Sequence, residues 1–346
     1  MKRFKKAVLK CPPLLIALYF LLRIRYGFSV YRMLCIRYGI KHTWYSAFLP
    51  STGDMFFAAA VYPELKRLEQ TQQEGIFLAV GDSGRQISEW FELERFVILR
   101  ERQSNNLLRL YRFLAGRSAL SFRVLHYQPA QMYIGICEAL LSFHHLDFLT
   151  MLCETAYGGL NKQMVIRPKT NRWTAEAAKT YLIQQGLQPG RTVILAPNAN
   201  CVQKLTPQFW QTLAEKLHNL GYSVCTNCAP DEAPISGTVK LQLQYQELAM
   251  ALSQAGHLIA LRSGLVDITG FIPCKRVLLY PRQNFNVWGV GSVLDCFSLK
   301  RMGICCDAAE FEFEADEQDA LMLRVIQEVS TWRREEEPGS QVCETG

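Results

Sequence analysis

An arginine, a serine and a glycine stand where a short apolar segment turns into a helix. In HLIALRSGLVDITGF (257–271), the pattern predicts a strand over His257–Leu261 and a tight turn at Arg262, Ser263 and Gly264, followed by a helix. A helix start presents unpaired N–H groups and partial positive charge, glycine lets a ligand approach closely, and arginine makes a two-pronged contact with phosphate. These residue types in this order indicate a site for an anionic ligand, a nucleotide diphosphate.

Other polar residues near this turn have both a binding and a structural interpretation. Lys204 can join the diphosphate contact or be a solvated loop cation, and Asn198 can touch the ligand or form a turn. Asp267 can orient Arg262, contact a sugar, or hold Arg262 in a structural salt bridge. The sequence leaves these alternatives open.

A second candidate catalytic residue is Asp54, which follows Thr52 and Gly53 after an apolar segment at 43–49. A carboxylate just past a strand can take a proton from a hydroxyl group as a general base. Asp54 can equally be a helix N-cap, because aspartate is common at helix starts.

The elements that must position these residues alternate between strand and helix. In the second half, Thr174 begins one helix and Thr206-Pro207 another. Strands are predicted at 192–196, 222–226, 257–261 and 276–280, and helices at 246–255 and 316–334. In the first half, strands are predicted at 43–49, 75–80, 96–99 and 120–126, a helix from residue 55, a polar turn at 81–85 and helical structure over 130–156.

This alternation predicts an α/β protein with parallel sheets and right-handed crossovers. The expected architecture is two Rossmann-like parallel-sheet domains facing across a cleft. The predicted divisions are a basic arm (1–42), an acceptor domain (43–165), a donor domain (166–315), a closing helix (316–335) and a disordered tail (336–346).

The net charge of +7 is concentrated at the N-terminus, where residues 1–41 hold ten Lys or Arg and no acid. This leaves 28 of the 38 basic residues for the rest of the chain, against all 31 acidic residues. The apolar run LLIALYFLL (14–22) is too short to cross a membrane, which takes about 20 helical residues. The arm is therefore predicted to lie on an anionic membrane surface or to be a buried first helix with a basic flank. Nucleic-acid binding is not expected, since no basic stripe recurs in the body.

The twelve cysteines are scattered through apolar segments, which is typical of reduced thiols in a cytosolic protein. Cys225 and Cys228 form a single CxxC at the end of a predicted strand, without further ligands at zinc spacing. No metal site is predicted.

Three segments resemble the bacterial heptosyltransferases of glycosyltransferase family 9. They are LPSTGDMFFAAAVYPELKRL (49–68), ILAPNANCVQKLTPQFWQTLAEKLHNLGYSV (194–224) and LRSGLVDITGFIPCKRVLLYP (261–281). The resemblance implies the GT-B fold and a metal-independent transfer of a sugar from a nucleotide-sugar donor to a glycan or lipid-linked acceptor, without a cofactor. It also implies a role in bacterial surface-polysaccharide synthesis at the inner face of the cell membrane, in the cytoplasm.

The resemblance implies a role for each site residue. Asp54 would be the general base, with Thr52 and Gly53 on the acceptor side. The donor diphosphate and nucleotide would be bound by Asn198, Lys204, Arg262, Ser263, Gly264 and Asp267. The chain departs from the family pattern at Arg262, where a small residue is usual, and at Asp267, where histidine is usual. A fucosyltransferase-like GT-B enzyme and an inactive sugar-nucleotide-binding or scaffold protein are the alternatives.

Overall fold

The computed structural model describes residues 13–39, 42–69, 74–114, 121–126, 145–164, 168, 173–200, 202–283 and 292–336. The chain divides into two compact units. Unit 1 comprises Met1–Ile134 and Leu152–Pro168, and unit 2 comprises Gly135–Met151 and Lys169–Gly346. The start of the basic arm, most of the helical region predicted at 130–156 and the tail after 336 lie outside the described residues, and the predicted domain limits and cleft stay predictions.

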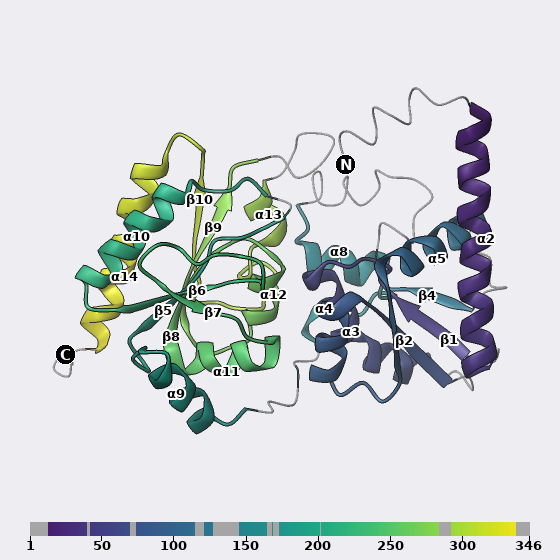
Figure 1. Cartoon of the computed structure of the whole chain (residues 1–346), viewed down its shortest axis with the longest axis horizontal. Helices are drawn as coiled ribbons and strands as arrows, with labels where there is room; N and C mark the ends of the chain where they lie inside the picture. The colour runs from purple at the N-terminus through teal and green to yellow at the C-terminus, as the bar shows by residue number, and fades with distance from the viewer. Residues whose placement is uncertain are drawn as a thin grey trace. The chain divides into compact units, whose positions relative to one another are not determined.

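Unit 1 contains a four-stranded, fully parallel sheet in the order β3-β2-β1-β4 (Figure 1). The strands are β1 (His42–Ser46), β2 (Glu74–Val80), β3 (Phe96–Leu99) and β4 (Phe122–Val124). In the register, Trp44 lies opposite Ile76 on one side and Phe122 on the other. All four predicted strands of this half are confirmed, with β1 and β4 shorter than expected.

The described helices of unit 1 include one that runs through a proline. The helices are α2 (Pro13–Tyr38), α3 (Thr52–Leu68), α4 (Gly81–Trp90) and α5 (Glu101–Phe113), with η2 (Lys162–Met164) as a 3-10 turn. Helix α8 (Phe148–Thr155) crosses the division between the units at Met151. Helix α3 continues past Pro63, and its side chains from Met55 to Tyr62 are buried.

The predicted polar turn at residues 81–85 is wrong, because these residues are the first turn of α4. Arg85 pairs with Asp82 one turn before it and with Glu89 one turn after it, at 2.7 and 3.1 Å. Such pairs three and four residues apart support a helix surface. The glycines at the start of α4 outweighed this charge pattern in the prediction.

Helix α2 packs along α5 through one narrow face. A Cβ atom at Gly27 would lie 2.5 Å from the backbone oxygen of Asn106 and 2.8 Å from the Cβ of Leu110, so only glycine permits this approach. The N-terminal half of α2 extends past α5 (Figure 1). Its exposed large side chains range from 37% to 58% exposure: Leu15, Leu18, Tyr19, Phe20, Leu21 and Leu22. None of the described helices has the length and apolarity needed to span a membrane.

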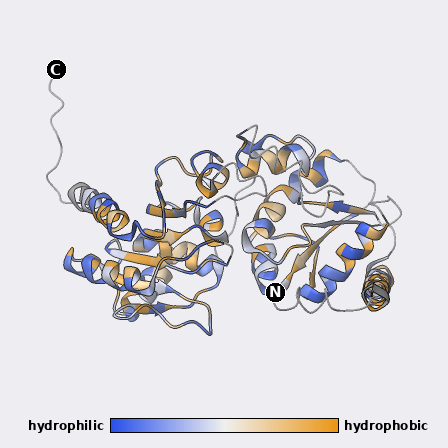
Figure 2. Cartoon of the chain, turned by 90° about the horizontal axis from the view of Figure 1, so that it is seen from above, coloured by the Kyte–Doolittle hydropathy of each residue, from blue (hydrophilic) through white to orange (hydrophobic). Residues whose placement is uncertain are grey.

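Unit 2 contains a six-stranded, fully parallel sheet in the order β10-β9-β8-β5-β6-β7. Its strands are β5 (Thr192–Ala196), β6 (Ser223–Asn227), β7 (Val239–Leu241), β8 (Gly256–Leu261), β9 (Lys275–Pro281) and β10 (Ala309–Phe313). The central strands β5 and β8 are buried along nearly their whole length, as expected for a parallel sheet covered on both faces. Figure 2 shows much orange, the colour of apolar residues, in the interior of unit 2.

Two helices of unit 2, α9 (Ala175–Gln184) and α10 (Pro207–Asn219), begin at the predicted caps. The other described helices of this unit are α11 (Tyr245–Ala255), α12 (Gly264–Thr269), α13 (Val293–Phe297) and α14 (Gln318–Glu336). The Thr174 hydroxyl accepts from the amide of Ala177 at 3.1 Å, and Thr206 accepts from Phe209 at 3.2 Å. Side-chain capping of this kind satisfies the free N–H groups of a first helical turn.

Candidate functional site

Asp54 lies in the first turn of α3, just beyond the carboxyl end of β1. Ser51 is the N-cap, Thr52 and Gly53 are the first two helical residues, and Asp54 is the third. The alternative of Asp54 as N-cap is therefore not realised. A negative side chain in this turn is favoured by the helix dipole.

The loop between β1 and α3 is held in an unusual conformation at Phe48. This residue has a φ of 59°, which is rare for a bulky side chain. Its amide donates to the Ser46 hydroxyl and its carbonyl accepts from the Ser104 hydroxyl, both at 3.0 Å. Such conformations persist where surrounding contacts enforce them and are often found near functional sites.

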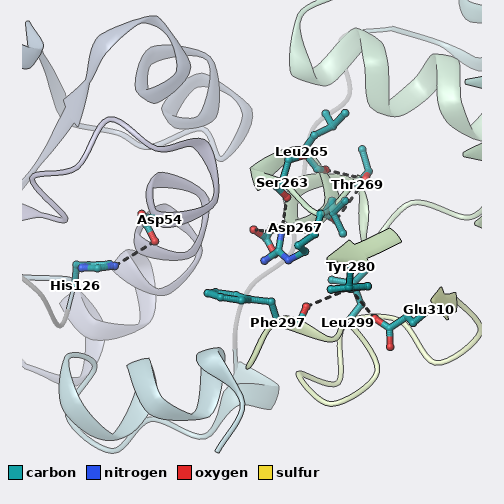
Figure 3. Close-up of polar contacts among 12 residues, drawn as sticks. Asp54, His126, Ser263, Leu265, Asp267, Thr269, Tyr280, Phe297, Leu299 and Glu310 are labelled. Carbon is teal, nitrogen blue, oxygen red and sulfur yellow. Dashed lines mark hydrogen bonds and ion pairs between the residues drawn. The ribbon is translucent and has the colours of Figure 1, made fainter. Parts of the chain in front are cut away.

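His126 pairs with Asp54 at the same edge of the sheet. Its Nε2 lies 3.2 Å from Oδ1 of Asp54 (Figure 3). The Ser51 hydroxyl donates to Oδ2. The side chain of Asp54 is 20% exposed, and that of His126 is 3% exposed. The pairing follows from topology, because β1 and β4 are parallel neighbours whose carboxyl ends meet at one edge.

A buried tyrosine lies close enough to Asp54 to be affected by its charge. Burial raises the pKa of Tyr157 well above its ordinary value, and the neighbouring Cys153 and Asp54 raise it further. Among the described residues its hydroxyl has no hydrogen-bond partner. The Tyr157 hydroxyl therefore remains neutral beside the carboxylate.

In unit 2, Arg262 follows β8 and is buried against Asp267 of α12. Its two terminal nitrogens contact the two carboxylate oxygens of Asp267 at 2.8 and 3.1 Å, and the side chains are 7% and 5% exposed. The guanidinium also lies 4.9 Å from the ring centre of Phe297, a cation–π distance. The salt bridge left open by the sequence is thus present, and the Arg262 charge is already compensated.

Ser263 and Gly264 begin α12 beside this pair. Ser263 is the N-cap, yet its side chain caps no backbone N–H, and Gly264 is the first helical residue. The Ser263 hydroxyl oxygen and the Nε of Arg262 are buried without a hydrogen-bond partner among the described residues.

A polar network holds the segment that carries Phe297. Glu310 accepts from the Tyr280 hydroxyl at 2.8 Å and from the Leu299 amide at 2.7 Å (Figure 3). It also accepts from the Ser298 hydroxyl at 2.6 Å. Phe297 also contacts Phe148, with ring centres 4.8 Å apart. The ring under Arg262 is therefore fixed by buried contacts.

Asn198 lies at the same sheet edge as Arg262. Ala196 of β5 lies opposite Ala260 of β8, and each polar residue comes two positions later. Asn198 and Lys204 are both exposed. The structure thus brings Asn198, Arg262 and Asp267 to one edge of unit 2, while Lys204 lies in the loop before α10.

No residue cluster able to hold a metal ion occurs in the described part of the chain. Cys225 and Cys228 are both buried at the end of β6, and burial raises the pKa of each thiol. Their burial agrees with the structural interpretation of this CxxC, which stays a prediction.

No protein-family model and no curated protein sequence matches the chain. Solved structures do match. The E. coli ADP-heptose lipopolysaccharide heptosyltransferase II is 14% identical, with a TM-score of 0.53 over 85% of this chain and 99% of that one. The glycosyl transferase family 9 protein from Veillonella parvula DSM 2008 is 13% identical, with a TM-score of 0.50 over 85% of this chain and 97% of that one.

The chain has the GT-B fold. The resemblance predicted from the sequence is confirmed at this level, since both matched proteins are glycosyltransferases by name. Identity of this order carries the GT-B architecture and not the reaction. The reaction must be argued from the residues of the site.

Proposed function

We propose that the chain is a GT-B glycosyltransferase that moves a sugar from a nucleotide-sugar donor to a glycan or lipid-linked acceptor. The observation that carries the proposal is Asp54, a partly exposed carboxylate at the carboxyl edge of a parallel sheet in a chain of this fold. The heptosyltransferase and family 9 proteins of similar structure support the same reaction class. Synthesis of a bacterial surface polysaccharide is the process that we propose for it.

The proposed step is an inverting, metal-independent displacement. The acceptor O–H bond breaks as its oxygen bonds to the anomeric carbon, and Asp54 takes the proton. The anomeric C–O bond breaks, and its electron pair leaves with the nucleoside diphosphate. Thr52 and Gly53 are proposed to flank the acceptor.

The diphosphate is proposed to bind at the edge of unit 2. The neutralised Arg262–Asp267 pair contributes oriented N–H groups and no net charge. Ser263 and Gly264 offer further donors, and the exposed Lys204 adds a cation that has no ion-pair partner among the described residues. Asn198 completes this proposed site.

We also propose that the arm holds the enzyme at an anionic membrane surface, the inner face of the cell membrane. Residues 1–41 contain no acid. Helix α2 exposes arginine side chains as well as large apolar side chains. Anionic headgroups attract such cations, while the acyl boundary accepts apolar side chains.

Asp54→Asn tests the proposal. The amide cannot accept the proton, so we expect turnover to fall at least about 10²-fold, the usual contribution of general base catalysis. Nucleoside diphosphate release from ADP-heptose and UDP-glucose measures turnover, and thermal shift with ADP and UDP measures binding, which we expect to persist.

Asp82→Asn is the matched control, because Asp82 is also an exposed carboxylate in the first turn of a helix of unit 1. Unchanged turnover in Asp54→Asn would remove Asp54 as the base. Nucleotide binding without turnover of any donor in the wild type would favour the inactive sugar-nucleotide-binding protein instead.

A further inference from the structure

We infer that His126 positions the general base. Its Nε2 holds Oδ1 of Asp54, so that Oδ2 is directed to the acceptor hydroxyl. This inference rests on the proposed function and adds to it a residue that carries no motif in the sequence.

The difference in exposure assigns the roles within the pair. At 20% exposure Asp54 is open to a substrate, whereas His126, at 3%, lies behind it and is closed to one. A general base must come within hydrogen-bonding distance of the proton that it removes. The carboxylate is therefore the base and the imidazole is its support.

The contact between Nε2 of His126 and Oδ1 of Asp54 indicates where the proton of the pair lies before the transfer. An ionised carboxylate only accepts hydrogen bonds, so Nε2 of His126 carries a proton and donates it to Oδ1. The Ser51 hydroxyl donates to Oδ2 and belongs to an exposed residue. During transfer the acceptor proton moves to Oδ2 and then leaves to water, while the proton on Nε2 stays in place.

The described titratable groups near the pair are neutral or already paired. From the end of α8, Tyr157 remains neutral because its pKa is raised, and Cys153 is a buried thiol. On β4, the Arg123 guanidinium is engaged by Glu69 of the α3 C-cap at 2.9 Å. The described groups next to the pair therefore add no further negative charge beside Asp54.

Two substitutions separate positioning from simple packing. His126→Leu keeps an apolar side chain and removes the donor, whereas His126→Gln places an amide N–H close to the position of Nε2. We expect kcat for nucleoside diphosphate release from ADP-heptose or UDP-glucose to fall about 10²-fold in His126→Leu, as for a misplaced reacting group. We expect KM for the donor to stay unchanged and His126→Gln to recover most of kcat.

His257→Gln is the control, because His257 is also a buried histidine but lies in unit 2. We expect it to leave kcat unchanged even if the melting temperature falls. If His126→Leu keeps wild-type kcat while Asp54→Asn loses it, the inference fails and the proposed function stands. If Asp54→Asn also keeps its kcat, the base assignment and this inference fail together.

A spectroscopic test needs no turnover. Among the six histidines of the chain, the ¹⁵N signals of His126 are assigned by their loss in His126→Gln. We expect a protonated Nε2 at neutral pH and a shift of its signal in Asp54→Asn but not in Asp82→Asn. A neutral ring with its proton on Nδ1 would overturn the inference.

Discussion

The contact that the structure shows for Arg262 differs from the one that its sequence context predicts. Beside a glycine turn it predicts a phosphate contact, yet its guanidinium is buried in a two-point salt bridge with Asp267. Burial of a charge is costly unless a partner compensates it. The first role of Arg262 is therefore to keep Asp267 paired and the turn before α12 in shape.

We predict that Arg262→Leu lowers the stability of unit 2 by about 3–5 kcal/mol, because it leaves the Asp267 carboxylate buried without its partner. The Arg262→Leu/Asp267→Leu double variant should recover much of this loss, since it removes both charges. Urea unfolding of the single and double variants measures the effect. Unchanged stability would contradict this structural role, and weaker ADP or UDP binding in the same variant would then leave Arg262 only its proposed contact with the diphosphate.

The sequence predicted the positions of Asp54 and Arg262 after strands, but not the pairing of His126 with Asp54. Asp54 and Arg262 stand beside glycines that mark strand-to-helix turns, so local pattern places them at strand ends. His126 has no such marker, and its pairing depends on β4 lying next to β1, which is a property of the whole sheet. The sequence feature that could have indicated His126 is its position at the end of the strand predicted at 120–126.

Among the elements, α2 and α5 make a close contact that is possible because Gly27 of α2 has no side chain. Arg23 donates to the Asn106 side chain at 3.4 Å, and Gly27 brings the two backbones together. Leu34 of α2 is fully buried in the core of unit 1 with Trp44 and Leu107. The contact thus anchors an otherwise exposed helix to the folded body.

We predict that Gly27→Leu separates α2 from α5 and costs about 1–3 kcal/mol, the usual penalty for overpacking. Ser29→Leu adds the same side chain at an exposed position of the same helix and should change stability by less than about 0.5 kcal/mol. Hydrogen exchange of the α5 amides and urea unfolding measure the difference. Equal protection of α5 in both variants would contradict the packing described for Gly27.

The elements of unit 2 were the more predictable from sequence, because two of its helices, α9 and α10, start at a capping threonine. The strand β5 was predicted to the residue, and α9 and α10 begin at the expected caps. By contrast, α4 and α5 are polar helices of high amphipathicity that begin without a side-chain N-cap of the usual type. Their local signals are the spacing of charged and apolar residues and not a capping residue.

At the scale of the whole molecule, charge and apolar exposure coincide at the N-terminus. Residues 1–41 carry ten basic side chains and no acid, while the remaining chain is slightly acidic. On α2, Arg25 and Arg32 are exposed together with Phe28, Met33 and Ile36. An anionic bilayer complements both properties, whereas a neutral surface complements only one.

We predict that the full chain sediments with vesicles of phosphatidylglycerol more strongly than with vesicles of phosphatidylcholine. Leu18→Ser/Leu21→Ser should weaken this binding by at least about tenfold, because each buried leucine contributes roughly 1.5–3 kcal/mol. Leu323→Ser, at a 71% exposed leucine of α14, is the control and should bind normally. Equal binding to both lipids would contradict the contribution of charge. If the double variant lost a dimer and kept its lipid binding, the exposed face of α2 would instead bind a second copy of the chain.

The strand orders have a consequence for synthesis on the ribosome. In unit 1, β1 emerges first, β2 adds to one side, β3 adds to β2, and β4 closes the other side of β1. In unit 2, β5 is likewise followed by β6 and β7 on one side and by β8, β9 and β10 on the other. Each newly translated strand thus joins an edge that already exists, and none has to be inserted between two formed neighbours. Both sheets can grow outward from their oldest strand while translation continues.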